Sequence, residues 1–299
     1  MKKYDIIMKE EENIEDFENK IFKIDVIEGL KKLPDNSISL IFADPPYNIG
    51  KKFGEDKDNG DKMAKDEYVI WCKNWIDECM RVLKPSGTFY FMGATQFIHY
   101  LDSYVSEKYN TICRIVWYYD SSGVQAKKYF GSLYEPIIMV VKDKNNYKFN
   151  AENVMVEAKT GAKRGLIDYR KTPPQPYNTE KVMGNVWEIP RVRYRMEEYE
   201  DHPTQKPEEL LRRIILASSD ENDLVLDPFS GSFTTCAVAK KLNRKFLGFD
   251  IEEKFVKIGL RRLGLAQTFN GENLDKVKKK KTNNKSKQDH ILNGTLNIT

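Results

Sequence analysis

Four consecutive residues, Asp44, Pro45, Pro46 and Tyr47, have the chemistry needed to hold a planar amine. Proline has no backbone N–H donor, so this segment is rich in hydrogen-bond acceptors. The Asp44 carboxylate and the Pro45 carbonyl can each accept one hydrogen of an exocyclic NH₂ group, while Tyr47 stacks on the ring that bears it. The alternative interpretation is a Pro-Pro turn that ends a strand, with an aspartate that caps a helix.

A second segment, residues 226–232 (LDPFSGS), has the features of a turn that joins a strand to a helix. Its glycine allows a ligand to approach the backbone closely at a helix N-terminus. Asp250 follows about 20 positions later and ends the next predicted strand, where it can bind ribose hydroxyls. The phosphate-loop pattern and the full dinucleotide pattern are both missing, which favours a nucleoside without pyrophosphate; an ordinary tight turn is the alternative.

A third segment, residues 202–207 (HPTQKP), precedes a predicted helix. Thr204 can cap that helix and Lys206 can pair with a carboxylate. Taken alone, the segment is better explained as a proline-rich approach to the helix.

Strands and helices alternate around these segments. Residues 38–43 (ISLIFA) form an apolar run that only Ser39 interrupts, which predicts a buried strand that ends at Asp44. The other predicted strands are 21–25, 87–93, 111–119, 133–142, 224–229 and 244–250, and the predicted helices lie in 26–33, 66–83, 94–109, 202–219, 233–242 and 252–263. This alternation predicts an α/β fold with a doubly wound, mostly parallel sheet, which binds ligands at the carboxyl ends of its strands.

Positive charge is concentrated in two places, although the net charge of the chain is only +4. Residues 276–287 carry seven lysines and no acid, and residues 163–195 carry eight basic residues against three acidic ones, interleaved with aromatic side chains. Such a mixture is typical of a nucleic-acid-binding segment, or of a solvated loop. The predicted DNA contacts are Arg170, Lys171, Arg191, Arg193 and Arg195, and the last three alternate as on one face of a strand.

Composition excludes several classes of protein. No apolar run approaches the ~18 residues of a membrane-spanning helix, and the acidic N-terminus has no signal-peptide core, so we expect a cytoplasmic protein. The four cysteines form no C-x-x-C pair and the three histidines form no cluster, which argues against a disulfide scaffold and against a metal site.

The segments DPPYNIG, HPTQKPEELL, LDPFSGSFTT and FLGFDI together resemble the amino-group DNA methyltransferases, which act on N6 of adenine or N4 of cytosine. Their order, with the catalytic segment before the cofactor segment, resembles the permuted β-class of that family. Longer strings, such as EAKTGAKRGLIDYRKTPPQPYN, resemble the YhdJ-like solitary adenine methyltransferases of bacteria. The resemblance extends over about residues 21–263 and implies a circularly permuted, Rossmann-like fold that uses S-adenosyl-L-methionine.

The resemblance also implies roles for single residues. It assigns Asp44, Pro45, Pro46 and Tyr47 to an adenine flipped out of duplex DNA. It assigns S-adenosylmethionine to Asp25, Thr204, Lys206, Asp227, Phe229, Gly231, Ser232 and Asp250. One departure is visible, because Phe233 stands where many relatives have the last glycine of F-x-G-S-G.

The predicted organisation has five parts: a flexible acidic N-terminus (1–20), a catalytic half (21–142), a loop-rich target-recognition insert (143–201), a cofactor-binding half (202–268) and a flexible basic tail (269–299). Double-stranded DNA is the expected partner, in association with the nucleoid, and a homodimer is expected from the family alone. N4-cytosine methylation, methylation of RNA or a protein amide, and a catalytically silent DNA-binding protein are the alternatives. Intact Asp44 and Tyr47 argue against the last of these, and no nuclease-type cluster is found in the sequence.

Overall fold

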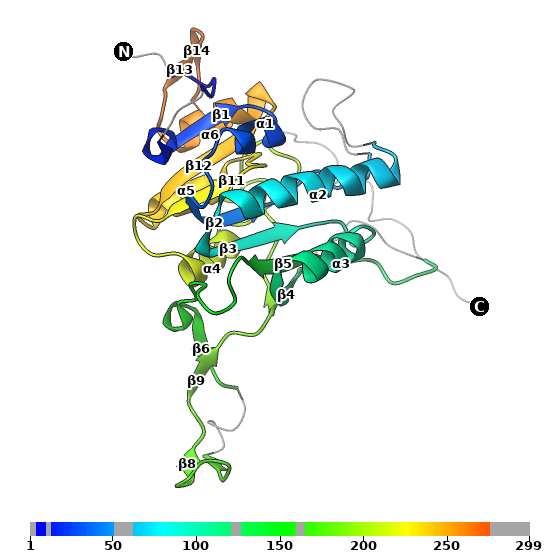
Figure 1. Cartoon of the computed structure of the whole chain (residues 1–299), viewed down its shortest axis with the longest axis vertical. Helices are drawn as coiled ribbons and strands as arrows, with labels where there is room; N and C mark the ends of the chain where they lie inside the picture. Colours follow the sequence, from blue (N-terminus) through cyan, green and yellow to red (C-terminus); the bar gives the residue numbers. More distant parts are fainter. Residues whose placement is uncertain (1–3, 10–12, 51–61, 121–126, 160–164, 276–299) are drawn as a thin grey trace, which may run out of the picture.

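The computed structural model describes residues 4–9, 13–50, 62–120, 127–159 and 165–275. Its central sheet has the order β1-β12-β11-β2-β3-β5-β4-β10 (Figure 1). Neighbouring strands are parallel except where β5 pairs with β3 and β4. The strands are β1 (Lys20–Lys23), β12 (Lys245–Asp250), β11 (Leu224–Asp227), β2 (Ile38–Ala43), β3 (Leu83–Met92), β5 (Tyr134–Val141), β4 (Asn110–Tyr118) and β10 (Val186–Glu188). The predicted doubly wound, mostly parallel sheet is thereby confirmed.

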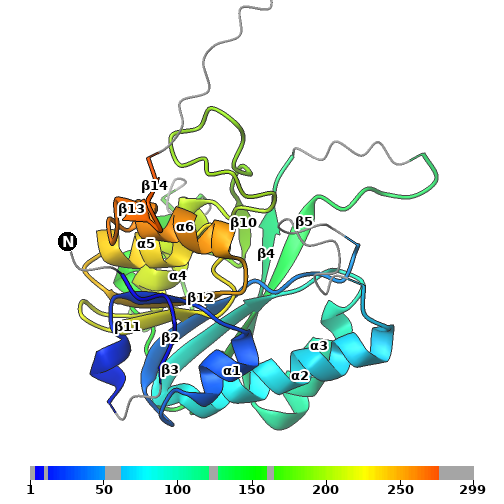
Figure 2. The same cartoon turned by 90° about the horizontal axis from the view of Figure 1, so that it is seen from above.

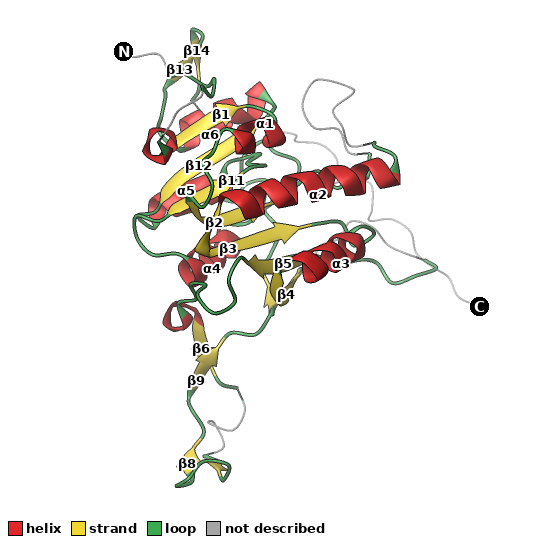
Figure 3. Cartoon of the chain, viewed as in Figure 1, coloured by secondary structure: helices red, strands yellow, loops and turns green. Residues whose placement is uncertain are grey.

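Helices cover both faces of the sheet, as Figures 2 and 3 show. One face carries α1 (Val26–Lys31), α2 (Lys65–Val82) and α3 (Ile98–Lys108), and the other carries α4 (Glu208–Ser218), α5 (Thr234–Lys241) and α6 (Glu253–Arg262). None of the described helices combines the length and the hydropathy of a bilayer-spanning segment.

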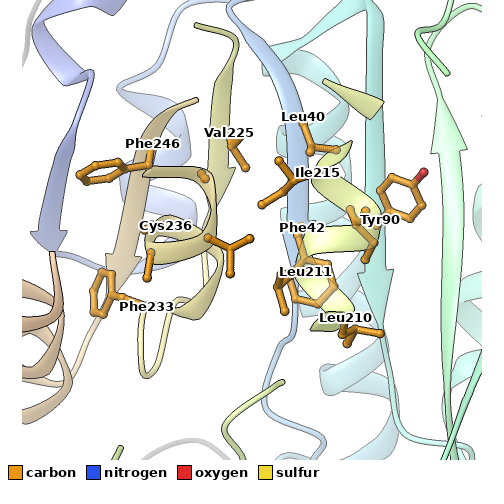
Figure 4. Close-up of a cluster of buried hydrophobic side chains, with 14 of the residues drawn as sticks. Leu40, Phe42, Tyr90, Leu210, Leu211, Ile215, Val225, Phe233, Cys236 and Phe246 are labelled. Carbon is orange, nitrogen blue, oxygen red and sulfur yellow. The ribbon is translucent and has the colours of Figure 1, made fainter. Parts of the chain in front are cut away.

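Strand β2 shows why residues 38–43 are almost all apolar. Leu40 and Phe42 belong to the core under α4 and α5, where Figure 4 places them beside Leu211 and Ile215. Ile41 belongs to the core on the opposite face, with Trp75 of α2. Because side chains alternate between the two faces and both faces are buried, five of the six positions are apolar. The exception, Ser39, is also buried, and its hydroxyl donates to Asp223 Oδ1 over 3.0 Å.

The region predicted as an irregular insert contains one strand of the central sheet and a projecting arm. Strand β10 pairs with the edge of β4 and buries Trp187. Before it, the short helix η2 (Ala151–Val154) leads into an arm that extends away from the sheet (Figure 1). The arm consists of β6 (Met155–Glu157) paired with β9 (Glu180–Val182), and β7 (Ile167–Asp168) paired with β8 (Gln175–Pro176). Strands of two or three residues are too short to give a periodic pattern.

Both ends of the described chain contain elements that the sequence analysis does not predict. Ile6, Met8 and Phe17 are buried, the last in the short helix η1 (Ile14–Phe17), so three apolar side chains of the N-terminal segment pack in the core. At the other end, β13 (Thr268–Phe269) and β14 (Glu272–Asn273) form a hairpin where the tail was predicted to begin. The lysine-rich segment 276–287 lies outside the described residues.

Candidate active site

The carboxyl ends of the parallel strands border one cavity of about 660 Å³. All the residues that the sequence assigned to catalysis and to the cofactor line it: Asp25, Asp44, Pro45, Pro46, Tyr47, Thr204, Lys206, Asp227, Phe229, Gly231, Ser232 and Asp250. The cavity therefore has two ends, which we call the DPPY end (residues 44–47) and the glycine-turn end (residues 227–232). Its size suits a small organic ligand.

At the DPPY end, β2 stops at Ala43 because two prolines follow Asp44. The Tyr68 hydroxyl donates to the Pro46 carbonyl over 2.8 Å and fixes this turn. The Tyr47 hydroxyl lies 2.9 Å from Asp44 Oδ1 and 2.8 Å from Glu135 Oε2, so two carboxylates hold the tyrosine ring in one orientation.

Lys206 places a positive charge between these two carboxylates. Its Nζ lies 2.5 Å from Asp44 Oδ2 and 3.6 Å from Glu135 Oε2, and only 8% of its side chain is exposed. With all three groups ionised, the cluster of Asp44, Glu135 and Lys206 carries a net charge of −1. A net negative charge can stabilise a positive charge that develops on a bound amine.

Burial and charge act in opposite directions on the three groups. Burial raises the pKa of Asp44, although Lys206 opposes this shift. Burial alone would also raise the pKa of Glu135, but Lys206 and the Tyr47 hydroxyl outweigh it and lower that pKa. Burial would lower the pKa of Lys206, yet the two carboxylates raise it, so the lysine stays protonated.

The sequence analysis does not identify Glu135 as a site residue, since it places this residue only within the predicted strand 133–142. Because β5 runs antiparallel to β3 and β4, its first residues lie at the same edge as the carboxyl ends of the other strands. The signal was an acid beside a proline at the start of that strand. Tyr119, which was also missed as a site residue, donates to Glu135 Oε1 over 3.1 Å and packs under Arg191.

At the other end of the cavity, two buried aspartates organise the glycine turn. Asp250 accepts from the backbone N–H of Gly231 and of Glu252, each over 2.8 Å, and each oxygen keeps a lone pair for a further donor. Asp227 accepts from the Thr235 hydroxyl and the Phe229 N–H. Burial raises the pKa of Asp227 and of Asp250 to about 7 each.

Gly231 is required at this turn for two reasons. Its φ of +50° is a left-handed conformation, and a Cβ there would lie 2.8 Å from His202 Nε2. The cavity wall nearby is aromatic, because Phe229 packs edge-on against Trp71 and Trp75.

Asp25 has a structural role besides lining the cavity, since Oδ1 accepts from the N–H groups of Ile27 and Glu28 at the start of α1. Thr204 does not cap α4: the helix begins at Glu208 after Pro207, and Thr204 faces the cavity instead.

Phe233 adopts a conformation that suits glycine. Its φ is +57° and its side chain is fully buried at the start of α5. A Cβ on Gly248 would lie 2.9 Å from the Phe233 ring, and a Cβ on Gly259 would lie 2.6 Å from it. Two glycines elsewhere therefore leave room for the ring that replaces the motif glycine.

The five predicted DNA-contacting residues lie in two parts of the chain. Arg170 and Lys171 follow β7 on the arm, where Arg170 pairs with Asp168 over 2.8 Å. Arg191 lines the cavity, while Arg193 and Arg195 are exposed. The prediction that Arg191, Arg193 and Arg195 share one face of a strand is wrong, because the chain turns there and Arg195 has a φ of +81°.

Known proteins share this fold and sequence. The family described as DNA methylase matches residues 38–261. DNA adenine methyltransferase YhdJ of Escherichia coli (strain K12) is 55% identical over 269 residues, 89% of this chain and 90% of the relative. The solved structure of the PvuII cytosine-N4-specific DNA methyltransferase covers 81% of this chain and 85% of its own, with a TM-score of 0.62 and 18% identity. The solved structure of the M1.HpyAVI–SAM complex matches over 81% of this chain and 98% of its own chain, with a TM-score of 0.55 and 23% identity. At these identities the two structures show a common fold.

Proposed function

The chain belongs to the DNA methylase family, and from this premise we propose that it transfers a methyl group from S-adenosyl-L-methionine to N6 of an adenine in DNA. The high identity to a DNA adenine methyltransferase supports adenine as the target. The observation that carries the proposal is the single cavity in which Asp44 and Tyr47 face the same space as Asp227 and Asp250. An amine-binding group and a nucleoside-binding group are thereby held within one site.

The residues at the glycine-turn end fit S-adenosylmethionine. Asp250 and Asp25 offer acceptors for ribose hydroxyls and an adenine amine, and Phe229 and Trp71 offer aromatic walls. Asp227 can pair with an ammonium or sulfonium charge. When bound, this cofactor supplies a methyl group that is already strongly electrophilic.

At the DPPY end, the protein orients the attacking amine. The adenine N6 is a poor nucleophile because its lone pair is delocalised into the ring. Hydrogen bonds from both of its hydrogens, to Asp44 and to the Pro45 carbonyl, favour a pyramidal nitrogen with an exposed lone pair. Tyr47 stacks on the base, and catalysis then depends mainly on alignment at roughly 3–3.5 Å. The negative cluster of Asp44, Glu135 and Lys206 stabilises the positive charge that develops on N6.

An adenine reaches such a cavity only after it leaves the duplex, which costs a few kcal/mol. We propose that Arg191, Arg193 and Arg195 contact DNA beside the cavity and that Arg170 and Lys171 contact it from the arm. A side chain that reads a base should relax sequence specificity when it is replaced, whereas a phosphate contact should only weaken binding.

We also propose that residues 143–201 select the DNA sequence, between a catalytic half (21–142) and a cofactor-binding half (202–268). A homodimer and association with the nucleoid belong to the same proposal. Sedimentation of the purified chain with and without DNA tests the dimer.

Sequencing of modified bases tests the function in cells. DNA from cells that express the chain should carry N6-methyladenine at one recurring motif that is unmodified in cells without it. N4-methylcytosine in place of methyladenine, or no new modification, would reject adenine as the target.

A further inference from the structure

An exposed aromatic pair, Tyr129 and Phe130, precedes β5. Phe130 has a relative exposure of 102% and Tyr129 of 71%. Exposure of large apolar side chains to water is unfavourable, and two adjacent ones form a candidate contact surface for another molecule. Lys127 and Lys128, both exposed, come immediately before this pair, so the segment combines aromatic rings with positive charge.

The pair lies at the rim of the active-site cavity. Ser132, two residues after Phe130, lines the cavity, as does Tyr134 at the start of β5. Two residues span at most about 7 Å, so the Phe130 backbone lies within that distance of the cavity wall. Figure 2 shows the segment that leads into β5 extending away from the helical layers. The next residue of β5, Glu135, contacts Tyr47 inside the site.

The chemistry of this rim matches duplex DNA at the point where one base is missing from the stack. When an adenine leaves the helix, its two neighbours lose a stacking partner and a gap opens between them. An aromatic ring restores stacking on both sides, because every base presents a π-face. Two lysines next to the ring can contact the phosphates that flank the gap.

We propose that Phe130 inserts into the DNA helix at the position that the flipped adenine vacates, while Lys127 and Lys128 bind the adjoining phosphates. The proposal rests on the proposed function, because it requires an adenine to enter the cavity. It assigns Phe130 to stabilisation of the opened DNA, a step before methyl transfer.

Two duplexes that differ only opposite the target adenine test this assignment. In one the adenine is paired with thymine, and in the other it faces an abasic site, so that it is already unpaired. Phe130→Ala should lower the single-turnover rate on the paired duplex about tenfold, the loss expected for one base–aromatic stack. On the abasic duplex the same variant should stay within about twofold of wild type. Phe130→Trp should retain the wild-type rate on both.

Ile7→Ala is the matched control, because Ile7 is also exposed (68%) but lies beside β1, at the opposite edge of the sheet from β4. It should leave both rates unchanged. The logarithm of the DNA association constant falls linearly with the logarithm of the salt concentration. Replacement of Lys127 and Lys128 by alanine should reduce the magnitude of this slope by about 2, whereas Phe130→Ala should leave the slope unchanged.

Two results would overturn the inference: an equal loss on both duplexes, which would indicate a general defect, or no loss on the paired duplex. A wild-type chain that methylates neither duplex would overturn the proposed function and this inference with it.

Discussion

Lys206 Nζ lies 2.5 Å from Asp44 Oδ2, a contact between residues that are 162 positions apart in the sequence. Four residues before the lysine, the same segment places His202 against Gly231 and Phe255 at the other end of the cavity. One short segment thus contacts both ends of the site. Arg262 ties the residues that follow this segment to the glycine turn. Its guanidinium donates to Glu208, at the start of α4, and to the Ser232 carbonyl of the turn.

Lys206→Met should shift the pH dependence of catalysis. Burial raises the pKa of Asp44 and Lys206 opposes that shift, so removal of the cation should raise this pKa further. In the proposed mechanism the ionised Asp44 carboxylate binds the amine, and it is ionised only above its pKa. The acid limb of kcat/KM should therefore move to higher pH, with about tenfold less rate for each pH unit below the new pKa. A profile that stays in place would contradict this role, and Lys206→Arg serves as the charge-conserving control.

Glu135→Gln should slow methyl transfer without weakening the binding of S-adenosylmethionine. The substitution keeps the shape of the side chain but changes the net charge of the cluster from −1 to 0. We expect the single-turnover rate to fall about tenfold or more, with an unchanged dissociation constant for S-adenosylmethionine. Tyr119→Phe, which removes one hydrogen bond to Glu135 and no charge, should cost less. Equal rates for Glu135→Gln and wild type would show that its charge is not needed.

Phe233 and Gly259 should be strongly coupled in stability. Gly259→Ala places a methyl group 2.6 Å from the Phe233 ring and should destabilise the wild-type chain by about 1–3 kcal/mol. Phe233→Ala should itself cost about 3 kcal/mol, since loss of a buried phenylalanine outweighs any relief at its left-handed φ. In the Phe233→Ala background, Gly259→Ala should cost little. Urea unfolding of the four proteins measures this coupling, and strictly additive free energies would contradict it.

Asp227 should make the folded chain less stable as the pH rises. Burial raises its pKa to about 7 in the folded state, whereas the unfolded value is near 3.8, so between these values the folded chain binds a proton that the unfolded chain releases. The free energy of unfolding should therefore fall from about pH 4 to about pH 7. Asp227→Asn, which cannot ionise, should reduce this fall, and urea titrations across that range measure it. An identical slope in the variant would show that Asp227 is ionised in the folded chain.

Much of the fold follows from local sequence. The apolar run of β2 ends at Asp44 as predicted, because two buried faces favour apolar side chains at nearly every position and two prolines stop the strand. The glycine turn at Gly231 was also predicted correctly as a junction between a strand and a helix.

Glu135 and the ends of the chain required information that is not local. The direction of β5 decides whether Glu135 points to the active-site edge, and strand direction depends on pairing with β3 and β4. Ile6 and Met8 are buried, and the Ile6 carbonyl accepts from the Lys23 N–H of β1, although seven of the first twelve residues of the chain are charged. The alternation of Arg191, Arg193 and Arg195 suggested a strand, but no neighbouring strand pairs with those described residues.

The most direct test of the account combines product identity with one substitution. The purified chain receives duplex oligonucleotides of varied sequence and S-adenosylmethionine with a labelled methyl group, and the DNA is digested to nucleosides for mass spectrometry. Wild type should yield labelled N6-methyladenine, and Asp44→Ala should yield none while it binds the cofactor with near-wild-type affinity. Label found only on cytosine, or near-wild-type methyl transfer by Asp44→Ala, would contradict an adenine amine held by Asp44.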